Sequence, residues 1–147
     1  IQDINSCGNV SEKEEDMEFN PALPIYLQVM SSIKRDIVTG ELSPGEKLPS
    51  VRDMALRYTI NPNTAGRVYR ELESEGVCFT RRGMGTFVTE DEDKIEQMKE
   101  EMVQELAVQF LEGMKLIGIS GEDAVEWIRK LSQQYCSETE QNANGKE

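Results

Sequence analysis

The chain has 147 residues, 16 Lys and Arg against 28 Asp and Glu, and a formal net charge of -12. This length excludes a large multidomain enzyme, and the overall negative charge argues against a nucleic-acid partner. The charge is uneven, however, because residues 22–89 carry nine basic and seven acidic side chains between two acidic segments. With no histidine and three widely separated cysteines, the composition favours neither a zinc site nor a disulfide framework, and we expect no metal and no cofactor.

The N-terminal part of the chain changes character at Pro24. Residues 1–21 are polar, acidic and aperiodic, so we expect a disordered leader. Apolar residues then recur every four positions across residues 25–37, which predicts an amphipathic helix that Gly40 ends. Residues 41–50 contain a Pro-Gly pair and predict a compact turn. No apolar run is long enough to span a membrane and no signal peptide opens the chain, so we expect a cytoplasmic protein without a membrane partner.

Two helix starts follow in close succession. Ser50 is typical of an N-cap and predicts a short helix that runs to about Tyr58. Asn61 is a second N-cap residue, and Pro62 occupies the first helical position, where a missing N–H costs nothing. The third helix should therefore run from Pro62 to about Glu75.

The apolar period changes from helical to alternating beyond the third helix. Residues 77–80 and 86–88 alternate, and the glycine-rich residues 81–85 lie between them, which predicts a β-hairpin. Three helices and a hairpin within residues 22–89 are the outline of a winged helix-turn-helix domain.

Residues 90–136 carry two predicted amphipathic helices, separated by a break at residues 118–121. Two such helices cannot bury their apolar faces on each other completely, so we expect the helical hairpin to pair with that of a second chain. The fold class is then α+β, and residues 137–147 should form a disordered tail. The predicted dimer interface is made of Met102, Leu106, Phe110, Met114, Trp127, Ile128 and Leu131.

The predicted third helix has one basic, polar face. At 100° per residue, Asn63, Gly66, Arg67 and Arg70 lie opposite the apolar side chains of the same helix. Arg can bind guanine O6 and N7 with two hydrogen bonds, and Asn can do the same for adenine N6 and N7. Alternatively, the arginines are solvated partners of nearby carboxylates, as surface charges often are.

The run LPSVRDMALRYTINPNTAGRVYRELESEGVCFTRRGMGTFV resembles the gluconate-repressor (GntR) family of bacterial transcription regulators, from Pro24 to about Thr89. The segment with N-P-N-T and R-x-Y-R-E-L-E is similar to the YtrA-like branch, whose short C-terminal domains form two helices. Pro62 and Gly66 depart from the commonest family pattern, and the resemblance then implies that Arg67 takes much of the base readout. Together, the resemblance and the basic surface give these candidate DNA contacts: Lys47, Ser50, Arg52, Asn61, Asn63, Thr64, Arg67, Arg70, Arg81, Arg82 and Gly83.

The sequence thus predicts a sequence-specific DNA-binding regulator, a homodimeric repressor of a palindromic operator. By resemblance, the regulated genes would form a neighbouring transporter operon. The alternative is a winged helix that serves as a protein-interaction module without sequence-specific DNA binding. An enzyme is the weakest candidate, because no nucleophile has a histidine beside it and we find no catalytic residues. A small effector bound near Trp127 and Phe110 is a further hypothesis, against the simpler view that Trp127 is ordinary interface core.

Overall fold

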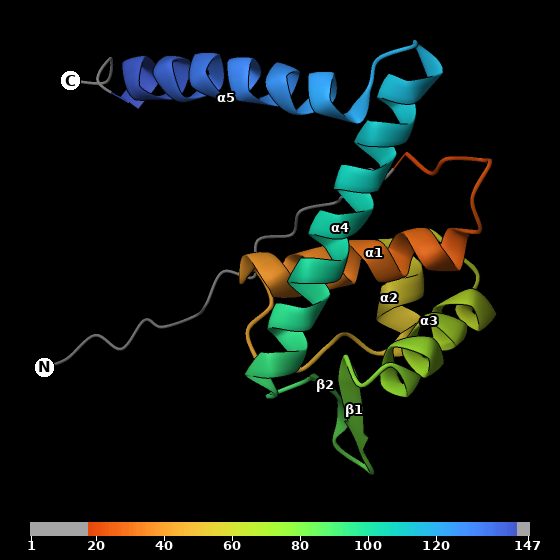
Figure 1. The fold of residues 1–147 in the computed structure, drawn as a ribbon. Helices are drawn as coiled ribbons and strands as arrows, with labels where there is room; N and C mark the ends of the chain where they lie inside the picture. Colours follow the sequence, from red (N-terminus) through yellow and green to blue (C-terminus); the bar gives the residue numbers. More distant parts are fainter. Residues whose placement is uncertain (1–17, 144–147) are drawn as a thin grey trace, which may run out of the picture. The chain divides into compact units, whose positions relative to one another are not determined.

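The computed structural model describes residues 18–143, which form three helices, a two-stranded hairpin and two further helices (Figure 1). This order confirms the predicted α+β class, with a winged helix-turn-helix followed by two C-terminal helices. The elements are α1 (Ile25–Thr39), α2 (Val51–Arg57), α3 (Pro62–Ser74), β1 (Cys78–Arg81), β2 (Gly85–Val88), α4 (Glu92–Leu116) and α5 (Gly121–Ala143).

The helix boundaries follow from local side-chain chemistry. The Ser50 side chain accepts a hydrogen bond from the Asp53 N–H at 3.1 Å, and the Asn61 side chain accepts one from the Asn63 N–H at 2.8 Å. Each bond satisfies a backbone donor that the first turn of a helix leaves without a partner. Gly40 ends α1 in the left-handed conformation, with φ of 81°. The predicted caps are therefore confirmed.

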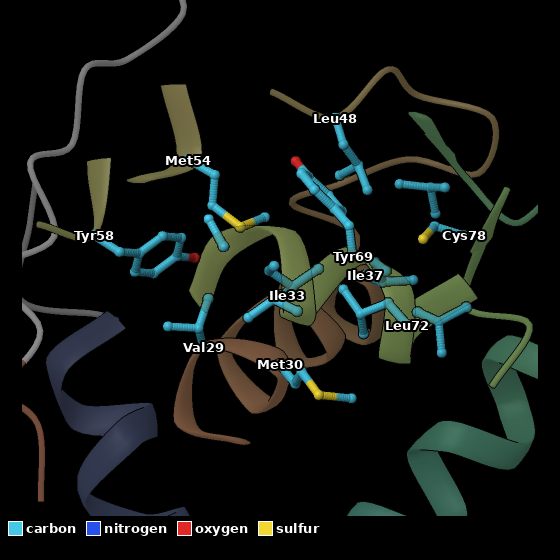
Figure 2. Close-up of a cluster of buried hydrophobic side chains, with 14 of the residues drawn as sticks. Val29, Met30, Ile33, Ile37, Leu48, Met54, Tyr58, Tyr69, Leu72 and Cys78 are labelled. Atoms are coloured by element: carbon cyan, nitrogen blue, oxygen red, sulfur yellow. The ribbon is translucent and has the colours of Figure 1, made fainter. Parts of the chain in front are cut away.

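The first three helices and the hairpin enclose one hydrophobic core (Figure 2). Val29 and Ile33 from α1, Met54 from α2, and Tyr69 and Leu72 from α3 point toward one another in this core. Leu72 is 0% exposed. The Tyr69 hydroxyl donates a hydrogen bond to the Pro49 carbonyl oxygen, and burial raises the pKa of this phenol.

The hairpin carries an extra extended segment at its edge. β1 and β2 pair antiparallel with Cys78 opposite Val88. On the other side of β2, the Val88 N–H donates to the Glu46 oxygen and the Leu48 N–H donates to the Thr86 oxygen, both at 2.8 Å. Part of the predicted turn at residues 41–50 therefore lies alongside the hairpin as extended backbone.

The hydrophobic core extends into α4, beyond the boundary at residue 89 that the sequence suggests. Met98 is 2% exposed and belongs to this core, and Ile95 packs against it. The chain divides into two compact units between Lys99 and Glu100, inside α4. We call residues 18–99 the head and residues 100–143 the tail, and describe each by itself.

The ends of the described chain are more ordered than the composition suggests. Phe19 packs against the head core, and the Gln28 side chain exchanges hydrogen bonds with the Asn20 backbone at 2.7 and 2.9 Å. α5 continues to Ala143, into the segment expected to be disordered, because Gln, Glu and Ala there are helix-compatible residues. The rest of the predicted leader and of the predicted disordered tail, residues 1–17 and 144–147, lies outside the described residues. Among residues 18–143, no helix is long and apolar enough to cross a membrane.

Candidate nucleic-acid interface

α3 separates an apolar face from a polar face along its length, as the sequence predicts. The side chains that face the core are all buried: Ala65, Val68, Tyr69 and Leu72. Asn63, Arg67 and Arg70 are exposed. The exposed face therefore presents one amide and two guanidinium groups to solvent, and these groups suit the edges of bases in a DNA groove.

The first turn of α3 carries three of the predicted contact residues. Asn61 is the N-cap, so its side-chain oxygen is engaged by the backbone. Asn63 is exposed, and among the residues that the structure describes its side-chain amide has no hydrogen-bond partner. Thr64 is half-buried. Of the three, Asn63 is the side chain whose hydrogen-bonding groups are free to meet a base.

Arg67 lies against α1. Its guanidinium carbon is 3.7 Å from the centre of the Tyr26 ring, and its Nε is 3.8 Å from the Glu71 carboxylate. The first contact is a cation–π interaction, and the second is an ion pair across one helical turn. Tyr26 falls within the apolar segment of residues 25–37, and nothing in the local sequence links it to a residue so far along the chain.

Arg70 lies along α3 on the side of α2. An added Cβ at Gly66 would be 3.5 Å from an Arg70 guanidinium nitrogen and 4.0 Å from a Val51 methyl group. The Arg70 side chain thus turns back toward the N-terminus of α3, as long helical side chains do. Val51 is the first residue of α2, so the Arg70 guanidinium lies where α2 and α3 approach each other.

The start of α2 holds two more predicted contacts, Ser50 and Arg52. The Ser50 hydroxyl donates to the Asp53 carboxylate at 2.6 Å, in addition to its capping bond. A phosphate contact by this hydroxyl therefore requires it to leave Asp53. Arg52 is exposed, in the first turn of α2.

The β1–β2 hairpin, which is the wing of the domain, carries a cation beside an aromatic pair that the sequence pattern does not indicate. The Phe79 and Phe87 rings stack with their centres 5.8 Å apart, and the Arg81 guanidinium lies 5.2 and 5.5 Å from them. The turn that follows presents exposed Arg82 and Gly83. Gly83 has φ of 76°, so a residue without a Cβ suits this position.

Lys47 joins the wing through the extended segment beside β2. Its backbone forms a bridge with Phe87, and its Cε would lie 2.8 Å from a Cβ added at Gly85. The lysine side chain therefore crosses the wing directly over a glycine that leaves room for it. Lys47 thus lies beside β2, and Arg81 lies at the end of β1 in the same hairpin.

The carboxylates at the C-terminal end of α3 have partners within the head. Glu75 forms an ion pair with Lys34 of α1, and Glu73 accepts a hydrogen bond from the Thr80 N–H at 3.0 Å. These contacts hold α1 and β1 onto α3. The carboxylates at the C-terminal end of α3 therefore contact α1 and β1, whereas the amide and guanidinium groups lie on the exposed face of the helix.

The tail presents an apolar surface and none of the predicted DNA contacts. Leu106 is 66% exposed and Trp127 is 52% exposed. The seven predicted interface residues divide into two groups: Met102, Phe110 and Met114 are half-buried, whereas Leu106, Trp127, Ile128 and Leu131 are exposed. A hollow on α4 is lined by Glu101, Gln104, Glu105, Val108 and Gln109, which differ from the residues predicted for an effector site.

Among the described residues there is no group of three or more metal-ligating side chains. Cys78 is buried in the head, and burial raises the pKa of its thiol to about 12, with a smaller contribution from the Glu73 carboxylate. A thiol of this kind stays protonated and is a poor nucleophile. Cys78 is therefore a core residue.

Comparisons with known proteins agree with this geometry. Residues 25–88 match the family described as "Bacterial regulatory proteins, gntR family". The chain is 40% identical over 118 residues to "Uncharacterized HTH-type transcriptional regulator YhcF" of Bacillus subtilis (strain 168), covering 80% of this chain and 98% of that protein. It is 37% identical over 110 residues to "HTH-type transcriptional repressor YtrA" of the same organism, covering 74% of this chain and 85% of that protein.

A solved structure is similar over most of the chain. It is described as "GntR family transcriptional regulator from Listeria monocytogenes", with a TM-score of 0.70 and 38% sequence identity. The match covers 76% of this chain and 98% of the other. The predicted resemblance, including its similarity to the YtrA-like branch, is therefore confirmed.

Proposed function

The chain belongs to the gntR family of bacterial regulatory proteins, whose members are DNA-binding transcription regulators, and from this premise we propose that it is a homodimeric repressor of a palindromic operator. The name of one relative, the repressor YtrA, supports the direction of regulation. We expect the protein to act in the cytoplasm. The regulated genes would form a neighbouring transporter operon.

The observation that carries the proposal is the exposed face of α3. Asn63, Arg67 and Arg70 lie on it, and the helix itself is fixed to the core by its opposite face. A rigid helix with amide and guanidinium groups on its outer face suits the major groove. Arg52 and the wing residues Arg81 and Arg82 are exposed cations of the same head that would contact phosphates.

The apolar surface of the tail supports the homodimer. One chain leaves Leu106, Trp127, Ile128 and Leu131 exposed. Large apolar patches on a protein surface usually mark an interaction site, and a two-fold axis would let the same patch cover its copy. A palindromic operator then follows, because two heads related by this axis would meet two inverted half-sites about 10 bp apart, or a multiple of that distance.

The proposal is tested by selecting duplexes from a random pool with the full-length protein and measuring their affinity by fluorescence anisotropy. We expect an inverted repeat, with an affinity that falls steeply as salt rises. Operators in which the half-site spacing is changed by 5 bp should bind more weakly, because the second head then faces the wrong side of the duplex. Failure to enrich any sequence, together with the absence of salt-dependent DNA binding, would instead support a protein-interaction module.

A further inference from the structure

The two arginines on the exposed face of α3 are held in different ways. Arg67 has two partners, the Tyr26 ring at 3.7 Å and the Glu71 carboxylate at 3.8 Å. Arg70 forms no ion pair or hydrogen bond through its side chain with any residue that the structure describes. A guanidinium that is already engaged loses those contacts when it moves to a base, whereas a free one loses only water.

Helix geometry places Arg70 closer than Arg67 to the line along α3 that runs through Asn63. Seven residues separate it from Asn63, so the two lie about 20° apart around the helix axis. Arg67 is four residues from Asn63 and lies about 40° away on the other side, toward α1. The backbone positions of Asn63 and Arg70 thus lie nearly in one line along α3, and the long arginine side chain can reach the groove that Asn63 faces.

Gly66 leaves room for the Arg70 guanidinium beside this line, on the side of α2. The Arg70 nitrogen is 3.5 Å from the position of an added Cβ, and a Val51 methyl group is 4.0 Å from the same position. A methyl group fits there in ordinary van der Waals contact. A branched side chain at the same position would collide with the guanidinium and would displace it from this part of the helix surface.

We infer that the Arg70 guanidinium contacts the edge of a base, and that Gly66 determines specificity because a residue without a bulky side chain leaves room for this guanidinium. Arg67 is a positioning residue, whose contact with Tyr26 holds α3 against α1. This inference rests on the proposed DNA-binding function and assigns the readout within it. The base expected opposite Arg70 is guanine, whose O6 and N7 accept both hydrogen bonds of a guanidinium edge.

The test uses lysine variants, which keep the positive charge and the phosphate attraction but replace the rigid planar fork of the guanidinium by a single ammonium group on a flexible stem, so that the contact with guanine O6 and N7 is less well oriented. Binding-site selection is run in parallel for the wild type, Arg70→Lys and Arg67→Lys. We expect Arg70→Lys to lose about tenfold or more of its preference at one guanine of each half-site. We expect Arg67→Lys to keep the wild-type preferences while its melting temperature falls, because it weakens the contact with Tyr26.

Two variants at the glycine sharpen the result. Gly66→Leu should lose preference at the same guanine as Arg70→Lys, whereas Gly66→Ala should keep it. Circular dichroism melts verify that each variant is folded at the assay temperature. If Arg67→Lys flattens the selected motif and Arg70→Lys does not, or if both flatten it equally, the inference is overturned. If the wild type selects no motif, the proposed function fails instead, so the two failures are distinguishable.

Discussion

The head and the tail use the same kind of amphipathic helix in opposite ways. In the head, the apolar faces of α1, α2 and α3 meet one another and the hairpin, and Leu72 has no exposed surface. In residues 100–135, Ala124 alone is buried, and side chains such as Leu106 and Trp127 remain exposed. Helical periodicity therefore predicts which side of a helix is apolar, but not whether its own chain or another chain covers it.

The largest effect should come from opening the head core. Leu72→Ala should lower the free energy of unfolding by about 2–5 kcal/mol, because it removes buried methyl groups and leaves a cavity. Urea unfolding followed by circular dichroism measures the loss. Leu56→Ala, at a side chain that is 71% exposed, is the matched control and should change stability by less than about 0.5 kcal/mol. Equal losses in the two variants would contradict the burial pattern.

A charge on the tail should act on assembly rather than on the head. Leu131→Glu should weaken dimerisation by about 2 kcal/mol or more, roughly 30-fold, because it buries a carboxylate in an apolar interface. Sedimentation equilibrium measures the change, and operator affinity should fall with it. Ser132→Glu places the same charge on a neighbouring polar position of α5 and is the control. A monomeric wild type, or dimers unaffected by Leu131→Glu, would contradict the proposed interface.

A smaller effect should follow loss of the ring that holds Arg67. Tyr26→Leu should destabilise the head by about 1 kcal/mol, because the cation–π contact disappears. Tyr26→Phe keeps the ring and should lose little. The comparison of the two melting temperatures measures the effect of the aromatic face, since both variants remain apolar at this position. If leucine is tolerated as well as phenylalanine, the contact has no stabilising effect.

The smallest effect at neutral pH concerns the buried titratable groups of the head. The pKa of Cys78 is about 12 in the folded chain against an ordinary value of 9.0, and the pKa of Tyr69 is raised as well. The folded state thus keeps protons that the unfolded state releases, so stability is complete below pH 9 and falls as the pH rises toward 12. Urea unfolding at pH 8 and pH 10 should show this loss. Cys78→Ala should reduce the difference between the two pH values, and an unchanged difference would exclude the thiol as a cause.

Local features of the head could be predicted from the sequence. Ser50, Asn61 and Gly40 determine helix ends through contacts with residues only a few positions away, so their chemistry is visible in the sequence. The polar face of α3 follows from its period for the same reason.

Contacts between distant segments could not be predicted in this way. Tyr26 meets Arg67 only after α1 has packed on α3, and a side chain in an apolar stripe gives no sign of this partner. The segment at Lys47 is too short to show an alternating pattern, although its backbone joins β2. The engagement of Arg67 and the freedom of Arg70 also depend on the fold, because the two residues are of the same type and lie on the same helix face.

The position of Met98 determines where the head can be separated from the tail. α4 crosses the division between the two units without a break, and Met98 belongs to the head core although it follows the first turn of that helix. A chimaera that joins this head to the tail of a relative would have to exchange sequence after Lys99, within the helix. A junction at the end of the hairpin would replace Ile95 and Met98. Because both side chains pack in the head core, a relative's residues that fit less well there would leave a cavity in it.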